Sequence, residues 1–97
     1  METLHYDYPA KARFPRRVHV GVVGSGDLEV LMEPTDAPRA TVVINTSVDG
    51  FGTVWKSVID RFFSRFDAQV AIEINDFGAT PGVVLLRLEQ AVEEGTS

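Results

Sequence analysis

Ser25 is the side chain with the clearest capacity for chemistry in this 97-residue chain. It lies between Gly24 and Gly26, and Asp27 follows them. Two neighbours without side chains leave the serine hydroxyl open to close approach by another protein. The same residues predict a tight turn, because glycine adopts positive φ at little cost and aspartate bonds to nearby amides. We therefore expect a hydroxyl at the tip of a turn, open to modification; the plainer alternative is a turn serine without a function.

No base that would activate Ser25 stands close to it in the sequence. A nucleophilic serine needs a positioned histidine and a carboxylate, and His5 and His19 are the only histidines. His19 precedes Ser25 by six residues on a predicted strand, which makes it an unconvincing partner. We therefore predict that Ser25 is the substrate of a modifying enzyme. A small enzyme that uses Ser25 or His19 remains an open alternative.

Three other groups of side chains are weaker candidates. A basic cluster has the charge to bind phosphate, although a solvated arm explains it better; its members are Lys11, Arg13, Arg16 and Arg17. Carboxylates on or beside the hairpin predicted over residues 18–33 have no histidine or cysteine nearby to complete a metal site, which makes a weak case for a metal; they are Asp27, Glu29 and Glu33. Residues 76–78 resemble the magnesium loop of protein kinases, but a chain this short has no room for that fold, so they predict a turn.

Composition argues against several classes of function. The formal net charge of −5 repels nucleic acid phosphates and anionic membranes, so neither is expected as a partner. The absence of cysteine excludes disulfides and thiolate chemistry. No apolar run approaches the roughly 20 residues of a membrane span, and residues 1–7 lack the features of a secretory signal. A cytoplasmic location is therefore expected.

Strands are predicted on both sides of the turn that holds Ser25. Residues 18–23 and 28–33 each alternate with period two, the pattern of a strand with one buried face. Two strands with a tight connection predict a β-hairpin. Residues 41–46, rich in β-branched side chains, and residues 70–74 predict two further strands.

Apolar residues at helical spacing predict two helices. The stronger pattern covers residues 51–66, with Asp49 as its expected start signal. The second helix is expected to start at Thr80 as the N-cap, with Pro81 in the first turn and an apolar stripe to residue 92. The order β-β-β-α-β-α predicts an α+β two-layer sandwich, with about four strands and two helices on one face of the sheet.

The length of the chain argues for one domain. Residues 18–97 are expected to form it, and residues 1–17 to form an irregular or extended N-terminal arm, with a strand possible near residues 4–8. A domain of this size buries only about 60% of the surface of its unfolded chain, which leaves little room for a deep catalytic cleft. The scarcity of catalytic side chains therefore favours a binding, carrier or assembly role.

Three segments carry a resemblance to a known family: Gly21–Leu31, Val48–Gly52 and Glu73–Gly82. In this order, and in a chain of this length, they are similar to the acyl carrier (delta) subunit of malonate decarboxylase over residues 18–94. The carrier subunit of citrate lyase is similar at the Ser-Gly-Asp step into an alternating strand. Carriers of the fatty acid type instead have Asp-Ser-Leu at a helix start, so their helical-bundle fold is not expected.

The resemblance implies that Ser25 is joined by a phosphodiester to a 2'-(5''-phosphoribosyl)-3'-dephospho-CoA group. A phosphoribosyl-dephospho-CoA transferase would install this arm from a triphosphoribosyl precursor. An acyltransferase subunit, the malonyl transferase, would exchange acetyl for malonyl on the thiol, and decarboxylase subunits would release carbon dioxide and regenerate acetyl. The chain would then be a non-catalytic carrier in the conversion of malonate to acetate, with Gly24, Gly26 and Asp27 flanking the anchor.

Two further hypotheses concern the surface around the arm. Asp27 and Glu29 are expected at a docking surface, since acidic carriers meet basic patches on enzymes, and Arg16 or Arg17 is a candidate to steady the phosphates. The alternative function is a small-metabolite-binding regulatory α+β module, because β-rich two-layer domains often sense metabolites in oligomers. Reversible metabolite binding without a covalent adduct would favour it.

Overall fold

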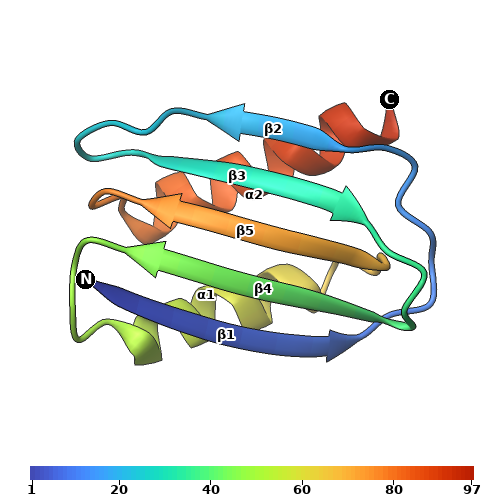
Figure 1. The fold of residues 1–97 in the computed structure, drawn as a ribbon, viewed down its shortest axis with the longest axis horizontal. Helices are drawn as coiled ribbons and strands as arrows, with labels where there is room; N and C mark the ends of the chain where they lie inside the picture. Colours follow the sequence, from blue (N-terminus) through green and yellow to red (C-terminus); the bar gives the residue numbers. More distant parts are fainter.

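The structure is a computed structural model that describes residues 1–97, folded as one five-stranded sheet with two helices (Figure 1). The sheet has the order β1-β4-β5-β3-β2. Its strands are β1 (Glu2–Pro9), β2 (Val18–Gly21), β3 (Leu28–Pro34), β4 (Arg39–Thr46) and β5 (Val70–Asp76). The helices are α1 (Gly52–Phe63) and α2 (Pro81–Thr96). The predicted α+β sandwich is thus confirmed, with one strand more than expected.

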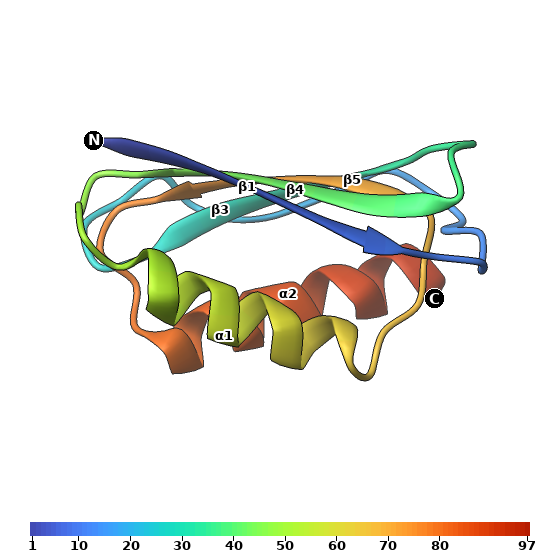
Figure 2. The same ribbon diagram turned by 90° about the horizontal axis from the view of Figure 1, so that it is seen from below.

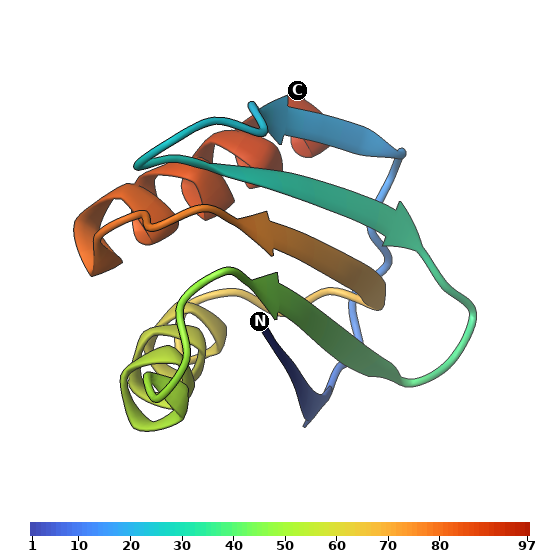
Figure 3. The ribbon, with the colours of Figure 1, turned by 60° about the vertical axis from the view of Figure 1, so that its left-hand side comes forward.

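The connections explain the strand directions. β2 and β3 form an antiparallel hairpin, and β3 also pairs antiparallel with β5. β4 and β5 are parallel, because α1 carries the chain back along the sheet between them, and parallel neighbours need such a crossover. Three loops consequently lie at the same end of the strands, which we call the Ser25 end: those of β2–β3, β4–α1 and β5–α2 (Figure 3).

Both helices cover the same face of the sheet (Figure 2). The alternation predicted for the strands places every second residue against the helices, as in β5, where Val70, Ile72 and Ile74 are buried. Ile59 of α1 and Leu88 of α2 are fully buried in the same core. Each such side chain stabilises the fold by about 1.5–3 kcal/mol, so the helices hold the sheet mainly through apolar contact. Neither helix is long and apolar enough to cross a bilayer.

The expectation for residues 1–17 needs correction. Residues 2–9 are extended, as predicted, but they form the edge strand β1 and pair with β4 along its whole length. A strand near residues 4–8 is among the expectations, but its place in the sheet is not, because β1 alternates between half-buried and exposed residues, with no fully buried position. Tyr8 stacks on Phe63 of α1 with ring centroids 4.4 Å apart. Ala10 and Phe14, farther along, belong to the core.

The start of α1 also differs from the prediction, whereas the start of α2 agrees with it. Asp49 does not cap α1; the N-cap is Phe51, without a side-chain hydrogen bond, and Asp49 instead pairs with the amino terminus at 3.1 Å. Thr80 caps α2 by accepting a hydrogen bond of 3.3 Å from the Val83 amide, with Pro81 in the first turn. A β-region residue with a side-chain oxygen is what an N-cap requires.

Candidate functional site at the β2–β3 turn

Ser25 lies at the exposed tip of the turn between β2 and β3, as predicted. The Asp27 amide donates to the Gly24 carbonyl at 3.1 Å and closes a four-residue turn. Gly26, the third residue, has φ of +76°, the conformation that a type II turn requires and that glycine adopts without strain. Nothing lies within 4 Å of a Cβ placed on Gly26. The serine hydroxyl is therefore open to an approaching protein.

The hairpin ends earlier than the sequence predicts. Strand character was expected to residue 23, but β2 stops at Gly21, whose φ is +83°. A Cβ at Gly21 would lie 2.1 Å from the Leu28 carbonyl oxygen, so only glycine allows β2 to lie this close to β3. Beyond this point Val22 and Val23 leave the sheet and are about 60% exposed. The segment that connects β2 to β3 and holds Ser25 is therefore longer than the alternation in the sequence predicts.

Backbone hydrogen bonds hold the turn against the loop between β5 and α2. The Gly26 amide donates to the Phe77 carbonyl at 2.7 Å, and the Phe77 amide donates to the Asp27 carbonyl at 2.9 Å. These two bonds continue the β3–β5 pairing past the end of β5. Ser25 is consequently displayed on a turn whose backbone is held at Gly26 and Asp27, directly after the serine.

Asp27 adds a side-chain attachment to α2. Its carboxylate accepts two hydrogen bonds from the Arg87 guanidinium, 2.7 and 3.2 Å long, and a third of 2.7 Å from the Leu28 amide. The Arg87 hydrogen bond, followed by that of Leu28, lowers the pKa of Asp27 below its ordinary value. A bidentate pair fixes direction as well as distance, so Arg87 orients the residue that follows the Ser-Gly step.

Asp76 has a structural role beyond that of a turn residue. Residues 76–78 were predicted only as a turn, but Asp76 is the last residue of β5 and is 3% exposed. Its carboxylate accepts hydrogen bonds from the Thr46 hydroxyl at 2.8 Å and from the Gly78 and Ala79 amides at 3.3 and 3.0 Å. Asp76 therefore joins the end of β4 to the loop that braces the Ser25 turn.

Asp76 could be found from the sequence pattern, whereas Arg87 could not. Asp76 continues the buried register of residues 70, 72 and 74, so a carboxylate at a core position of a strand was visible in the sequence. Arg87 lies sixty positions from Asp27, and no local pattern joins them. Only the fold brings that pair together.

His19 is engaged away from the turn. Its Nε2 lies 2.9 Å from Glu29 on β3, and Glu29 in turn accepts a 2.7 Å hydrogen bond from Asn75 on β5. Asn45 and Thr3 extend this row of side-chain hydrogen bonds across β4 and β1. The row thus crosses all five strands. The partners recorded for His19 give no support to a Ser25–His19 catalytic pair.

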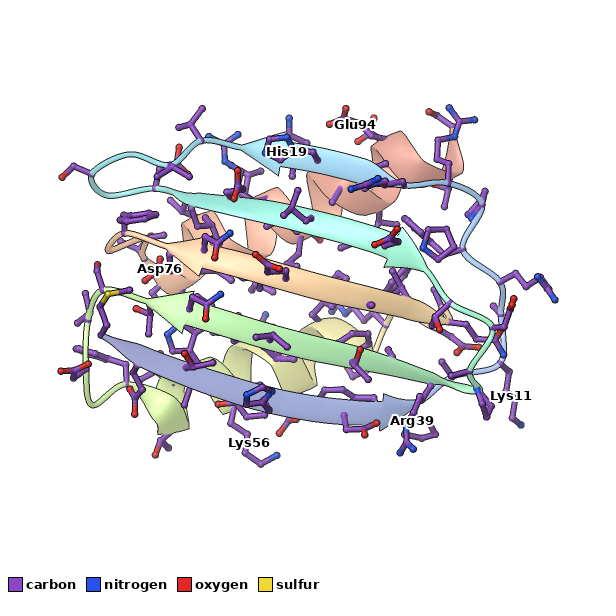
Figure 4. The ribbon with its side chains drawn as sticks, in the orientation of Figure 1. Lys11, His19, Arg39, Lys56, Asp76 and Glu94 are labelled. Atoms are coloured by element: carbon purple, nitrogen blue, oxygen red, sulfur yellow. The ribbon has the colours of Figure 1, made fainter.

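The basic cluster lies at the opposite end of the sheet from Ser25. Figure 4 shows Lys11 at one end and Asp76 at the other. Arg16 donates to the carbonyl of Ser97 at 2.8 Å, and Arg13 is 3.7 Å from Asp36. The hypothesis that Arg16 or Arg17 steadies phosphates at Ser25 is therefore not supported. The guanidinium that lies beside the turn is that of Arg87, and no group of three or more metal-ligating side chains forms.

Fold and site together define a class: a small α+β domain that holds one exposed serine hydroxyl on a braced glycine turn. A family model described as malonate decarboxylase delta subunit (MdcD) matches residues 15–95. The chain belongs to this family, as the resemblance in the sequence indicated.

Named relatives are similar in sequence to this chain over almost its full length. The malonate decarboxylase acyl carrier protein of Azotobacter vinelandii is 50% identical, over 97% of this chain and 96% of that protein. The protein of the same name from Pseudomonas aeruginosa strain PAO1 is 52% identical over the same shares. One chain in the crystal structure of a Pseudomonas malonate decarboxylase hetero-tetramer in complex with malonate aligns with a TM-score of 0.92 and 47% identity, covering 97% of this chain and 98% of that one.

Proposed function

We propose that this chain is the acyl carrier subunit of a malonate decarboxylase and that Ser25 is the attachment point of a phosphoribosyl-dephospho-CoA arm. The single observation that carries the proposal is the exposed Ser25 hydroxyl on a turn held by Phe77 and Arg87. Relatives with the name acyl carrier protein support the carrier role. A chain without cysteine needs an attached thiol to hold an acyl group as a thioester.

The site fits the attachment of a bulky group. The flanking glycines offer no side chain to a transferase pocket, and Gly26 is exposed with free space on its Cβ side. The carboxylate of the turn itself, that of Asp27, is paired with Arg87, so its charge is largely compensated when a phosphate is joined to Ser25. Both features lower the cost of placing a phosphodiester at this position.

Attachment is a phosphoryl transfer to the serine oxygen. The Ser25 Oγ forms a bond to the phosphorus nearest the ribose of the triphosphoribosyl precursor, the bond to the next bridging oxygen breaks, and pyrophosphate leaves. The hydroxyl proton passes to a base of the transferase, because the two histidines offer none here: His19 is paired with Glu29 and His5 lies on the edge strand β1. Oxidation states do not change.

When bound, the arm supplies a thiol that carries acetyl or malonyl as a thioester. The residues of this chain anchor and hold it: Ser25 would carry the phosphate, Phe77 fixes the turn against the β5–α2 loop, and Arg87 fixes it against α2. A flexible arm on a fixed base raises the effective concentration of the acyl group at several enzyme sites in turn. The partners are therefore the transferase, the malonyl transferase and the decarboxylase subunits, with no catalytic step assigned to this chain. Cytoplasmic function stays a prediction.

Intact-mass spectrometry after co-expression with the transferase tests the proposal. One mass increment of the arm is expected on the wild-type chain and none on Ser25→Ala. Ser57, an exposed serine on α1 without glycine neighbours, provides the matched control, and Ser57→Ala is expected to load like the wild type. An increment that survives in Ser25→Ala would contradict the assignment of the site. Reversible metabolite binding without an increment would favour a regulatory module.

A further inference from the structure

A cavity of about 330 Å³ opens at the Ser25 end, between the first turns of the two helices. Val48, Phe51 and Val54 line one side, and Ala79, Pro81 and Val84 line the other. Cavities that hold small ligands begin at about this size and are mostly apolar, with a few polar groups. Trp55, the only tryptophan of the chain, also borders this cavity.

Exposed apolar side chains gather at the Ser25 end, where this cavity opens, and three of them (Val48, Phe51 and Val54) line it. Eight large hydrophobic residues of the chain are exposed, and six of them lie in the loops or the first helical turn at the Ser25 end: Val22, Val23, Val48, Phe51, Val54 and Phe77. A concentration of exposed apolar surface in one place marks a binding site for a ligand or a partner. The other end of the sheet has no such concentration.

The cavity borders the turn that carries Ser25. Gly78 is part of its lining, and a Cβ on Gly78 would lie 4.0 Å from the Gly26 amide nitrogen. Gly26 follows Ser25 directly and is hydrogen-bonded to Phe77, the neighbour of Gly78. A long flexible group attached to Ser25 therefore starts beside the mouth of the cavity and can fold back into it.

The side chains that line the cavity decide which part of such an arm it can accommodate. Its polar side chains are Thr46 and Asp76, and the Asp76 carboxylate is buried, where it accepts hydrogen bonds from Thr46, Gly78 and Ala79. A second anion placed beside this carboxylate in an apolar cavity would be repelled and poorly solvated. The phosphates and a malonyl carboxylate are therefore disfavoured, whereas the uncharged thioester end with acetyl is compatible.

We infer that this cavity shelters the acetyl-bearing end of the arm and releases the malonyl-bearing end. The inference rests on the proposed function of Ser25 and extends it. A sheltered acetyl thioester is kept from water between transfers. A malonyl group, excluded by its charge, stays extended on the arm and available to the decarboxylase subunits.

Methyl NMR of the loaded chain tests the inference, with intact mass measured on the same samples. Chains loaded at Ser25 are compared as free thiol, acetyl thioester and malonyl thioester. Acetylation is expected to shift the methyl resonances of Val48, Val54 and Val84 and to change the fluorescence of Trp55. The malonyl form is expected to show most of this shift lost.

A matched pair of variants locates the effect. Val54→Phe enlarges a residue 42% exposed at the mouth of the cavity and is expected to abolish most of the acetyl-dependent shift. Leu86→Phe makes a comparable change at a helix position 62% exposed and outside the lining, and is expected to leave the shift intact. Equal effects of the two variants would overturn the inference.

The outcomes separate this inference from the proposed function. A missing mass increment contradicts the role of Ser25 itself. Full loading with unchanged cavity methyls, or with equal shifts from acetyl and malonyl, leaves the carrier role intact and overturns the sheltering. Methyl shifts that arise only when a partner subunit is added would assign the cavity to that partner and likewise overturn it.

Discussion

The Ser25 end and the opposite end of the sheet are held by different forces. At the opposite end, which we call the Phe14 end, Phe14 lies so close to Gly95 of α2 that a Cβ there would be 2.1 Å from its ring. The Phe14 ring also meets Phe66 edge-on, with centroids 6.1 Å apart. At the Ser25 end, backbone hydrogen bonds join the β2–β3 turn to the β5–α2 loop, and the Asp27–Arg87 pair joins the turn to α2. Apolar side chains there stay exposed.

The two ends of the sheet therefore differ in role: one contributes stability, and the other presents the Ser25 hydroxyl. Full burial of a phenylalanine contributes about 1.5–3 kcal/mol, whereas one hydrogen bond contributes only about 0.5–1.5 kcal/mol net but sets direction. The Phe14 end can therefore carry the stability of the domain. The Ser25 end can present one hydroxyl in a fixed orientation without burying the surface around it.

The largest effect is expected from Phe14→Ala. Phe14 is 4% exposed, and truncation of a buried phenylalanine costs about 3–5 kcal/mol of the free energy of unfolding. Urea unfolding, followed by the fluorescence of Trp55, measures this loss. Phe51→Ala at the Ser25 end is the control: Phe51 is 49% exposed, so a loss of about 1 kcal/mol or less is expected. Equal losses at the two ends would contradict the comparison.

A smaller effect is expected from Gly21→Ala at the base of the hairpin. The positive φ of Gly21 costs a residue with a Cβ about 1–3 kcal/mol, and the Leu28 carbonyl must also move away from the new methyl group. Urea unfolding reports the loss of stability, and amide exchange of Leu28 and Glu29 reports local opening of the pair.

Gly24→Ala sharpens this result as a matched control. A Cβ on Gly24 would meet only a Val22 side-chain atom, at an ordinary 3.8 Å. Its unfolding free energy is therefore expected to stay within about 0.5 kcal/mol of the wild type. If Gly24→Ala destabilised the chain as much as Gly21→Ala, the turn would be as constrained as the base of the hairpin, which contradicts this expectation.

The sequence reveals those parts of the fold that have a strong period. The alternation in β3 and β5 and the helical stripe through Trp55 and Ile59 predicted their elements, because a buried face repeats at the pitch of the element. β1 was missed as a strand of the sheet because an edge strand buries no residue fully, so its alternation is between half-buried and exposed positions.

The candidate site, like the fold, has one part that the sequence predicts and another that it does not. The turn around Ser25 was predictable, since glycine and aspartate specify turns by local chemistry. The pairing of Arg87 with Asp27 and the cavity between the helices were not predictable from the sequence, because both arise where segments far apart in the chain meet. Local chemistry therefore locates the candidate attachment residue, and the fold alone shows how that residue is held.

The smallest and most local effect is expected from Arg87→Gln, which removes the charge opposite Asp27. Because the hydrogen bonds from Arg87 are the largest cause of the lowered pKa of Asp27, the substitution is expected to raise this pKa toward its ordinary value. A group with a lowered folded-state pKa stabilises the fold above its unfolded pKa, and this contribution is lost as the pH falls through the lowered value. The wild-type turn should therefore loosen in this acid range, and the variant at a higher pH. NMR titration of the Asp27 carboxyl and amide exchange of Gly26 measure both effects.

Arg61→Gln, which changes an exposed arginine on α1, is the control and should leave the titration unchanged. An Asp27 pKa identical in Arg87→Gln and the wild type would show that the guanidinium does not orient the turn, and the rigidity of the Ser25 end would then rest on the Phe77 backbone bonds alone.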